Sequence, residues 1–395
     1  MRGFRSALDV SLAPGRLCAL VGEANAGKSN LLLAIRALLD PASARLGAED
    51  VSLGGDGRIS IDGSLAGGGE LQLVSRPPGA PRLSGRQPPP VAFLPGELRT
   101  GEVLAPAPAV ADASVAPALG RFARALAEQL DAGGDGSATA PAISLVNAIE
   151  ACCASAVRGL VLLIEEPELY LRPQAQRYLY RLLRRFADAG NQVIYSTHAP
   201  SFLNVARLEE LALVQRRSTS GTTIMHPKPI TPDEDFRVLT EFDAERSELF
   251  LARAALLVEG QTEKLAFPFV FDALGHDPDR EGISIVACDG KSNIPLFARV
   301  CHATRVPFIA VYDRDAPRGR RPSHSARSLN ALIARIAGPE RSVMLTPDFE
   351  GAAGLKGRQH KPEHAWRRLR SLPPEQIPPL LLDAVRRVLS LAREE

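Results

Sequence analysis

The stretch Gly22-Glu23-Ala24-Asn25-Ala26-Gly27-Lys28-Ser29 decides the fold of the first part of the chain. It matches the pattern G-x-x-x-x-G-K-[ST], and its context supports the match, because apolar residues 17–21 precede it and an apolar-periodic run at 30–39 follows. This order predicts a strand, a tight loop and a helix. Glycines let the backbone N–H groups of such a loop turn toward phosphate oxygens, and the helix N-terminus adds its positive end. The sequence therefore predicts a nucleotide site.

The lysine and the serine of this loop have defined chemical roles. Lys28 is expected to reach the β- and γ-phosphates of ATP, and the Ser29 hydroxyl is expected to bind Mg²⁺. A chance match is the alternative in a chain with 32 glycines, but the flanking strand and helix favour the nucleotide site. The other residues predicted to contact the nucleotide are Gly22, Asn25, Gly27 and Asn30.

Further along the chain, two apolar segments lead into polar side chains. Residues 160–164 run directly into Glu165 and Glu166, and residues 193–197 predict another strand that leads into His198. In phosphoryl transfer, one acid at a strand end can hold Mg²⁺ and the next can polarise the attacking water, and we assign these roles to Glu165 and Glu166. Exposed glutamate pairs are usually solvated surface, but this pair directly follows an apolar strand.

These motifs resemble the ATPase module shared by ABC, SMC and OLD (overcoming lysogenization defect) proteins. The resemblance implies that His198 is the switch histidine, which contacts the γ-phosphate of ATP. The chain departs from the family in its signature segment, which is at best the degenerate stretch at 136–139, and it has no convincing glutamine-loop residue. Because that signature contacts the nucleotide across a dimer, nucleotide binding is expected and ATP hydrolysis is left open.

A second acidic pattern begins after the apolar segment 254–258. The sequence Glu259-Gly260-Gln261-Thr262-Glu263 places Glu259 at the end of a predicted strand. If a helix begins after Gly260, Glu263 lies in its first turn, near the end of the same strand. The sequence thus predicts two carboxylates at one edge of a sheet.

A further predicted strand, at residues 307–312, leads into the sequence Asp313-Arg314-Asp315. Residues two apart in an extended chain point to the same face, so both aspartates can converge. Acidic strand ends are common, so this pair alone is weak evidence. Combined with Glu259 and Glu263, it forms a set of oxygen ligands without histidine, which suits Mg²⁺ or Mn²⁺ better than zinc.

The two acidic patterns together resemble the Toprim domain of topoisomerases, primases, small nucleases and OLD proteins. The resemblance implies that Glu259, Glu263, Asp313 and Asp315 bind metal for phosphodiester chemistry. Glu350 resembles a late acidic residue that completes a second metal site in OLD proteins, with Asp348 as an alternative ligand. Lys361 resembles a lysine that stabilises transition-state charge. An ordinary surface loop is the alternative for this stretch.

Arginines are frequent between the aspartate pair and this stretch. Such side chains beside a metal site suit contacts to DNA phosphates, although a solvated loop is an equal alternative. The arginines are Arg314, Arg318, Arg320, Arg321 and Arg327.

Composition limits the class of protein. The formal net charge of +2 gives no whole-chain field, so any nucleic-acid surface must be local. No apolar stretch approaches the roughly 20 residues that cross a bilayer, which argues against a membrane protein. The five cysteines contain no C-x-x-C pair, which argues against a zinc site and is typical of a cytoplasmic protein.

The order of motifs predicts an α/β protein with two domains. We expect an ABC-type P-loop ATPase domain over residues 1–248, with a variable region at 40–140 that contains short strands near 58–61 and 70–74. A Rossmann-like Toprim domain is expected over residues 249–395. Fusion of the two resembles the OLD family in particular.

Membership of that family implies an ATP-binding, Mg²⁺-dependent DNA endonuclease, with Mn²⁺ as a second candidate ion, in phage defence or DNA repair. It also implies a homodimer or higher homo-oligomer and, in some members, a UvrD-like helicase partner. The alternative function is a non-nucleolytic, SMC-like switch that binds DNA under the control of ATP.

Overall fold

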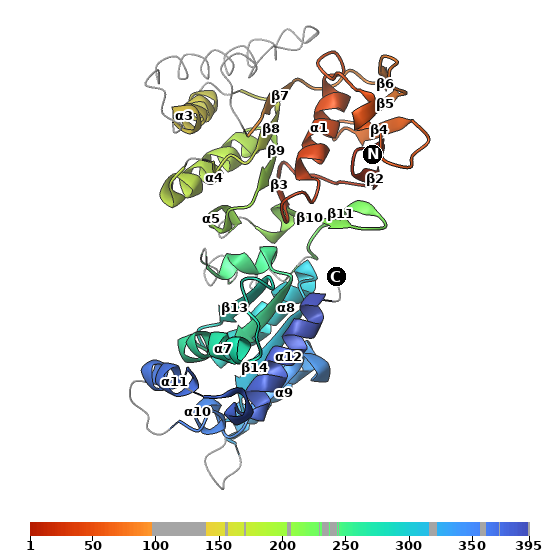
Figure 1. Ribbon diagram of the computed structural model, residues 1–395. Helices are drawn as coiled ribbons and strands as arrows, with labels where there is room; N and C mark the ends of the chain where they lie inside the picture. Colours follow the sequence, from red (N-terminus) through yellow and green to blue (C-terminus); the bar gives the residue numbers. More distant parts are fainter. Residues whose placement is uncertain are drawn as a thin grey trace. The chain divides into compact units, whose positions relative to one another are not determined.

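The computed structural model forms two compact units, Met1–Pro227 and Lys228–Glu395, which are described separately (Figure 1). The residues it describes are 1–96, 140–154, 157–169, 171–203, 207–228, 230, 237, 243, 245–315, 322–355, 361–370 and 372–393. Within them, no helix is both long and apolar enough to cross a membrane.

The division between the units lies before residue 248, where the sequence predicts the domain boundary, and that boundary stays a prediction. Hydrogen bonds join two of the described residues in this stretch to the rest of the second unit. The Lys228 N–H donates to the Ala303 carbonyl (3.1 Å), and the Arg237 guanidinium donates to the Asn293 side chain (2.8 Å). The described residues between 228 and 248 therefore belong to the C-terminal unit.

A small antiparallel sheet begins the first unit, with strand order β2-β1-β4-β5-β6. Buried and exposed side chains alternate along β5, as expected for a sheet with one covered face. The covered face packs against a helix through Ile59, Ile61, Leu71 and Leu73. The strands are β1 (Arg2–Phe4), β2 (Ala7–Asp9), β4 (Ile59–Ser64), β5 (Glu70–Ser75) and β6 (Arg82–Gly85).

The main sheet of this unit has the order β11-β10-β3-β9-β8-β7. All neighbours are parallel except the terminal pair β10 and β11, so five strands end at one edge. Its strands are β3 (Leu17–Val21), β7 (Val91–Leu94), β8 (Val161–Glu165), β9 (Gln192–Thr197), β10 (Leu211–Arg217) and β11 (Gly221–Met225). The central strand β3 is buried along its whole length.

Helices cover this main sheet. The helix α1 packs against β8 and β9, and α4 packs against β9 and β3 (Figure 1). Proline at the start of α4 fits a position where the backbone N–H has no partner within the helix. The helices are α1 (Lys28–Leu39), α3 (Ala140–Ala154), α4 (Pro173–Asp188) and α5 (Pro200–Leu203), with 3-10 turns η1 (Ala48–Asp50) and η2 (Leu208–Glu210).

The second unit is built on a parallel sheet of order β13-β12-β14-β15. Its strands are β12 (Ala254–Val258), β13 (Ile283–Ala287), β14 (Phe308–Asp313) and β15 (Ser342–Leu345). Its helices are α7 (Gln261–Ala273), α8 (Ile294–Thr304), α9 (His324–Ala337), α10 (Phe349–Ala352), α11 (Lys361–Leu369) and α12 (Pro379–Arg393), with 3-10 turns η3 (Arg246–Leu251), η4 (Lys291–Asn293), η5 (Pro339–Arg341) and η6 (Pro374–Gln376).

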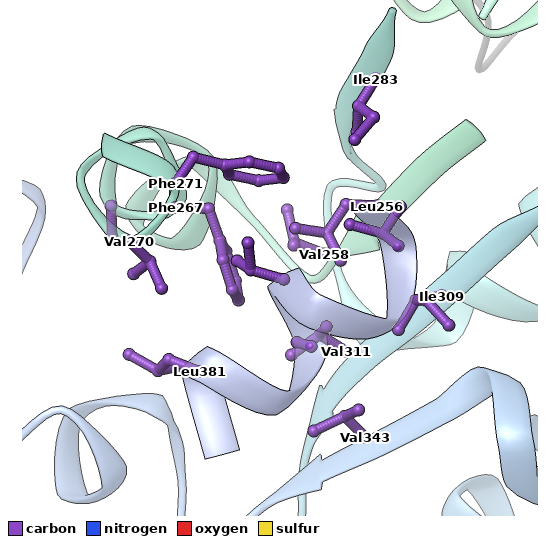
Figure 2. Packing of buried hydrophobic residues seen from close by; sticks show 14 of the residues in the cluster. Leu256, Val258, Phe267, Val270, Phe271, Ile283, Ile309, Val311, Val343 and Leu381 are labelled. Carbon is purple, nitrogen blue, oxygen red and sulfur yellow. The ribbon is translucent and has the colours of Figure 1, made fainter. Parts of the chain in front are cut away.

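One continuous core joins this sheet to α7 and α12. Figure 2 shows Phe267 and Phe271 of α7, Leu381 of α12, and Val258 and Ile309 of the two central strands, which all belong to one buried cluster. The other face of the sheet is covered by α8 and α9. Parallel strands buried on both faces are continuous apolar runs, which is why these segments are recognisable in the sequence.

Candidate functional site

The glycine-containing loop takes the expected form between β3 and α1. A Cβ atom on Gly22 would lie 2.0 Å from the carbonyl oxygen of Val214, so only glycine fits against this neighbouring strand. Gly27 begins the helix with φ 107°, a left-handed conformation that glycine adopts without strain. Asn25 is also left-handed, with φ 62°. The loop therefore turns sharply at the N-terminus of α1, as an anion site requires.

Lys28 is buried at this loop, with 5% of its surface exposed. Its Nζ donates to the carbonyl oxygens of Gly22 and Glu23, both at 2.9 Å. Burial lowers the pKa of Lys28 to about 8, while the nearby carboxylates of Glu166 and Glu168 act in the opposite direction. The lysine thus lies within the field of the acidic strand end, as the sequence predicts for a nucleotide site.

The two residues after Lys28 have different surroundings. Ser29 is exposed, which suits its predicted role toward Mg²⁺. Asn30 is held by the turn between β1 and β2: its Nδ2 donates to Ser6 Oγ (2.7 Å) and its Oδ1 accepts from Arg5 Nη1 (3.3 Å). Asn30 therefore connects α1 to the turn between β1 and β2 of the small sheet, and its predicted contact with nucleotide stays a prediction.

Glu165 and Glu166 lie where β8 ends, beside the end of β9. Glu165 Oε2 accepts from the Gly96 N–H at 3.3 Å. Glu166 has the left-handed φ of 45°, and its N–H donates to the Ser196 carbonyl at 3.1 Å. This turn directs Glu166 toward His198, with 3.3 Å between Oε1 and Nε2. The structure thus brings the predicted water-polarising acid and the predicted switch histidine together.

His198 has a pKa below its usual value. Burial is the main cause, and the positive charge of Lys28 lowers the pKa further, although Glu166 partly offsets both effects. A neutral imidazole is therefore favoured near pH 7. Such a ring can accept a hydrogen bond from water or donate one to a phosphate oxygen, depending on its tautomer.

Glu168 is a residue that sequence reasoning missed. It is 8% exposed, and its Oε1 accepts from the Thr197 hydroxyl (2.7 Å) and from the His198 N–H (2.8 Å). Its other oxygen, Oε2, is buried and has no hydrogen-bond partner among the described residues. Burial raises the pKa of Glu168. This carboxyl fixes the backbone at the end of β9 and so positions His198.

In the second unit, Glu259 and Asp313 meet at the carboxyl ends of neighbouring strands. Glu259 Oε1 accepts from the Asp313 N–H at 2.7 Å. Asp313 Oδ1 is buried without a hydrogen-bond partner in the part of the chain that the structure describes. Burial, followed by the charges of Glu259, Glu263, Asp315 and Glu350, raises the pKa of Asp313 to about 8. The predicted acids therefore interact electrostatically.

Glu263 is buried in the first turn of α7, where the sequence predicts it. Its Oε2 accepts from the Gly260 N–H at 3.2 Å, which caps the helix. Burial raises the pKa of Glu263 to about 7, and the negative charges of Glu259 and Glu350 contribute. Glu350, in α10, therefore acts electrostatically on this cluster, and its predicted role as a metal ligand stays a prediction.

The other residues of this stretch do not all join the cluster. Asp348 Oδ1 accepts from the Gly351 N–H at 2.7 Å and caps α10, so its carboxylate has a structural role. Lys361 is the first residue of α11, and its side chain lies outside the described residues. The degenerate signature at 136–139 and Arg318, Arg320 and Arg321 also lie outside them.

Lys291 is the second residue that sequence reasoning missed. Only 7% of its surface is exposed, and its Nζ donates to Asp315 Oδ2 at 2.8 Å and to the Asp313 carbonyl oxygen. It follows β13 in the sequence Asp289-Gly290-Lys291, where a strand end followed by a lysine was the available signal. A buried cation thus lies against the aspartate pair.

Among the described residues, some observations oppose a metal site in the second unit and others favour it. No three of the described His, Cys, Asp or Glu side chains form a group that could hold an ion as they stand. In this arrangement Lys291 Nζ donates a hydrogen bond to Asp315 Oδ2, and the Asp313 N–H donates one to Glu259 Oε1. Both of these carboxylate oxygens therefore already have a partner. The buried, unpartnered Asp313 Oδ1 and the excess of carboxylates nevertheless fit a hard cation.

Comparisons with known proteins match both halves of the chain. Residues 136–203 match the AAA ATPase domain family, and residues 250–315 match the family described as Overcoming lysogenization defect protein-like, TOPRIM domain. An OLD nuclease of Thermus scotoductus is 36% identical over 254 residues, which are 57% of this chain and 47% of that protein. The chain is similar to this OLD nuclease over more than half of its own length. Its fold is thus an ABC-type P-loop ATPase domain followed by a Toprim domain.

The similarity to OLD proteins is partial. The Old nuclease of Escherichia phage P2 is 28% identical over 162 residues, 39% of this chain and 28% of that protein. The chain therefore spans less than half the length of either relative. Two solved structures also match in part: the C-terminal region of the Burkholderia pseudomallei OLD protein (TM-score 0.31, 16% identity, 36% of this chain and 98% of that one) and the SMC head domain from Thermotoga maritima (TM-score 0.36, 15% identity, 58% and 97%).

Proposed function

We propose that this chain belongs to the OLD family and is an ATP-binding, Mg²⁺-dependent DNA endonuclease, in which the Toprim unit cuts and the ATPase unit regulates cutting. The observation that carries the proposal is the acidic cluster of the second unit. There Asp313 keeps a buried oxygen without a hydrogen-bond partner among the described residues, and its pKa is raised to about 8 by burial and by four neighbouring carboxylates. Such crowded negative charge is stabilised by a bound cation.

The residues that would hold the ion are all carboxylates. Oxygen ligands of this kind favour Mg²⁺ or Mn²⁺, and the bound ion would supply charge stabilisation to the attacking and leaving oxygens of a phosphodiester. The set is Glu259, Glu263, Asp313, Asp315 and Glu350. Lys291 would orient Asp315 through their ion pair. Lys361 would stabilise the negative charge that develops in the transition state.

In the ATPase unit, Lys28, Ser29 and Glu165 would bind ATP and its Mg²⁺. The pairing of Glu166 with His198 at 3.3 Å supports the assignment of both to the γ-phosphate end of the nucleotide. Glu168 would hold this end of β9 in place. The role that we propose for the unit is control of the Toprim site by nucleotide.

The wider biology follows the family and is also a proposal. We expect a cytoplasmic protein that forms a homodimer or higher homo-oligomer through its ATPase units and acts in phage defence or DNA repair. A UvrD-like helicase is the expected partner. Light scattering with and without ATP tests the assembly, and the neighbouring genes test the helicase.

The proposed function is tested by nicking of supercoiled plasmid DNA in Mg²⁺ or Mn²⁺. Glu259→Ala and Asp313→Ala should each abolish nicking. Asp272→Ala should not, because Asp272 is an exposed acid on α7 outside the cluster and is the matched control. Lys28→Ala should change nicking only when ATP is present, if the ATPase unit is regulatory.

Two outcomes would overturn the proposal. Cleavage that persists in both acidic variants would show that these carboxylates are not the site. Absence of cleavage by the wild-type chain on every form of DNA, together with ATP-dependent DNA binding, would establish the SMC-like switch instead.

A further inference from the structure

The helix α11 presents an indole ring to solvent. Trp366, the single tryptophan of the chain, is 41% exposed. The Arg370 guanidinium lies over its ring, 4.8 Å from the centroid. One residue before each of them, Ala365 and Leu369 are buried in the core of the unit, so the Trp366–Arg370 pair lies on the adjoining, outward side of the helix.

The surface around the ring is basic. Residues 361–370 contain four lysines or arginines against a single acid, Glu363. Glu363 is paired with Arg367 at 2.6 Å, so its charge is already balanced within the helix. Arg368 and Arg370 are exposed beside it. The ring therefore lies in a positive field, which attracts a polyanion.

The helix also belongs to the structure that carries the acidic cluster. It packs against α7, and Ala365 and Leu369 share a core with Phe267 and Phe271 of that helix. The first turn of α7 contains Glu263, one of the clustered carboxylates. A DNA strand bound along α11 would thus be held by a helix that packs directly on α7, which carries part of the acidic cluster.

We propose that Trp366 and Arg370 form a stacking platform for the bases of single-stranded DNA, with Arg368 contacting its phosphates. The proposal rests on the DNA endonuclease function and specifies the form of the substrate: a single strand, a flap or an unpaired end. In a duplex the faces of the bases are covered by their neighbours, so an exposed ring can stack only on unpaired bases. Base–aromatic stacking depends little on sequence, so no base preference is expected.

The single tryptophan makes the platform directly observable. The full chain carrying Asp313→Ala, in EDTA so that no cleavage occurs, is titrated with oligo(dT) and with a duplex at equal nucleotide concentration. Oligo(dT) should quench the fluorescence of Trp366, and the duplex should quench it much less. Because arginine–phosphate contacts release counterions, the affinity should fall as salt is raised.

Substitutions separate stacking from charge. Anisotropy of a labelled oligo(dT) should show affinity about tenfold lower for Trp366→Ala, while Trp366→Phe, which keeps a ring, should stay close to wild type. Tyr178→Ala is the matched control, because Tyr178 is 37% exposed in the first unit with Arg181 5.9 Å from its ring. It should leave the affinity unchanged.

Several results would overturn the platform: equal quenching by duplex and oligo(dT), unchanged affinity in Trp366→Ala, or a change of oligomeric state in that variant, which would make the ring a contact between copies of the chain. Quenching by oligo(dT) without any plasmid nicking by the wild type would keep the platform and refute the nuclease. Plasmid nicking by the wild type without quenching by oligo(dT) would keep the nuclease and refute the platform.

Discussion

At the scale of single residues, each unit buries a lysine at the carboxyl ends of its strands. Lys28 and Lys291 are 5% and 7% exposed, and each donates to a main-chain carbonyl oxygen. A buried cation is costly unless it is paired, so each lysine depends on the acids beside it. The two differ in their salt bridges, because Lys291 is ion-paired directly with Asp315.

Lys291→Met should bind Mn²⁺ several-fold more tightly than wild type and nick DNA at least about tenfold more slowly. Removing a positive charge from a group of carboxylates strengthens their attraction for a cation, and Asp315 loses the partner that orients it. Calorimetry of Mn²⁺ binding and the nicking rate test both parts. Weaker Mn²⁺ binding, restored by Lys291→Arg, would show instead that the lysine shapes the ligand set.

Asp313→Asn should stabilise the metal-free chain more at pH 8.5 than at pH 5. The folded-state pKa of Asp313, about 8, lies above its ordinary value of 3.8, so the stability due to the protonated carboxyl is complete below pH 3.8 and is lost as the pH rises through 8. Asparagine cannot ionise, so the variant does not lose this stability as the pH rises. Thermal melts in EDTA should show a gain in Tm of at least about 2 °C at the higher pH. An equal gain at both pH values would contradict the shift.

At the scale of elements, β8 and β9 are joined at their ends as well as along their length. Glu165 lies opposite Ser196 in the sheet, and Glu168 returns from the turn after β8 to the backbone at the end of β9. The position of His198 is therefore set by the strand pair and the turn together. One buried carboxyl connects the acidic strand end to the histidine strand end.

Glu168→Ala should lower the free energy of unfolding of the first unit by about 1–3 kcal/mol, because it leaves the buried Thr197 hydroxyl and the His198 N–H without their acceptor. Glu168→Gln keeps one carbonyl oxygen in place and should cost less than about 1 kcal/mol. Urea denaturation measures both. Equal losses in the two variants would mean that the negative charge, rather than the acceptor, is what the site needs.

At the scale of the whole molecule, each unit has its own hydrophobic core and its own proposed ligand site. Ligands that bind only the folded state stabilise it in proportion to the logarithm of their concentration over Kd. ATP and Mn²⁺ are therefore expected to act on different parts of the unfolding curve.

Calorimetry should resolve two unfolding transitions. ATP at about 100 times its Kd should raise one by about 5 °C, and Mn²⁺ should raise the other. Lys28→Ala should remove only the ATP shift, and Asp313→Ala only the Mn²⁺ shift. A single transition that both ligands raise equally would show that the two units unfold as one.

The sequence was sufficient where a motif directly follows an apolar strand. Glu165 in the first unit, and Glu259 and Asp313 in the second, were predictable because each lies at the end of a parallel strand. The parallel strands of one sheet end at the same edge, which is where the acids of that unit are expected. The similarity to OLD proteins and the order of the two domains were predictable for the same reason. The short strands of the variable region also appear, at 59–64 and 70–75.

The remaining site residues depend on packing that the sequence does not reveal. Glu168 acts across two strands through a single oxygen, and nothing in Glu165-Glu166-Pro167-Glu168 distinguishes it from a surface acid. Lys291 follows β13, which is separated from β14 by β12 in the sheet. Asp348 is the N-cap of α10, and the sequence alone does not distinguish an acid that caps a short helix from one that binds metal. Only the fold separates these cases.

The pairing of Glu259 with Asp313 also has a consequence for how the chain folds. The carboxylate of one accepts from the backbone of the other across 54 positions of sequence, and β13 and α8 form in between. Contacts of such high sequence separation carry a large loop-closure cost and form after local structure. The acidic cluster is therefore expected to form late, so that a nascent chain released before β14 would have the first acids without the aspartates that complete them.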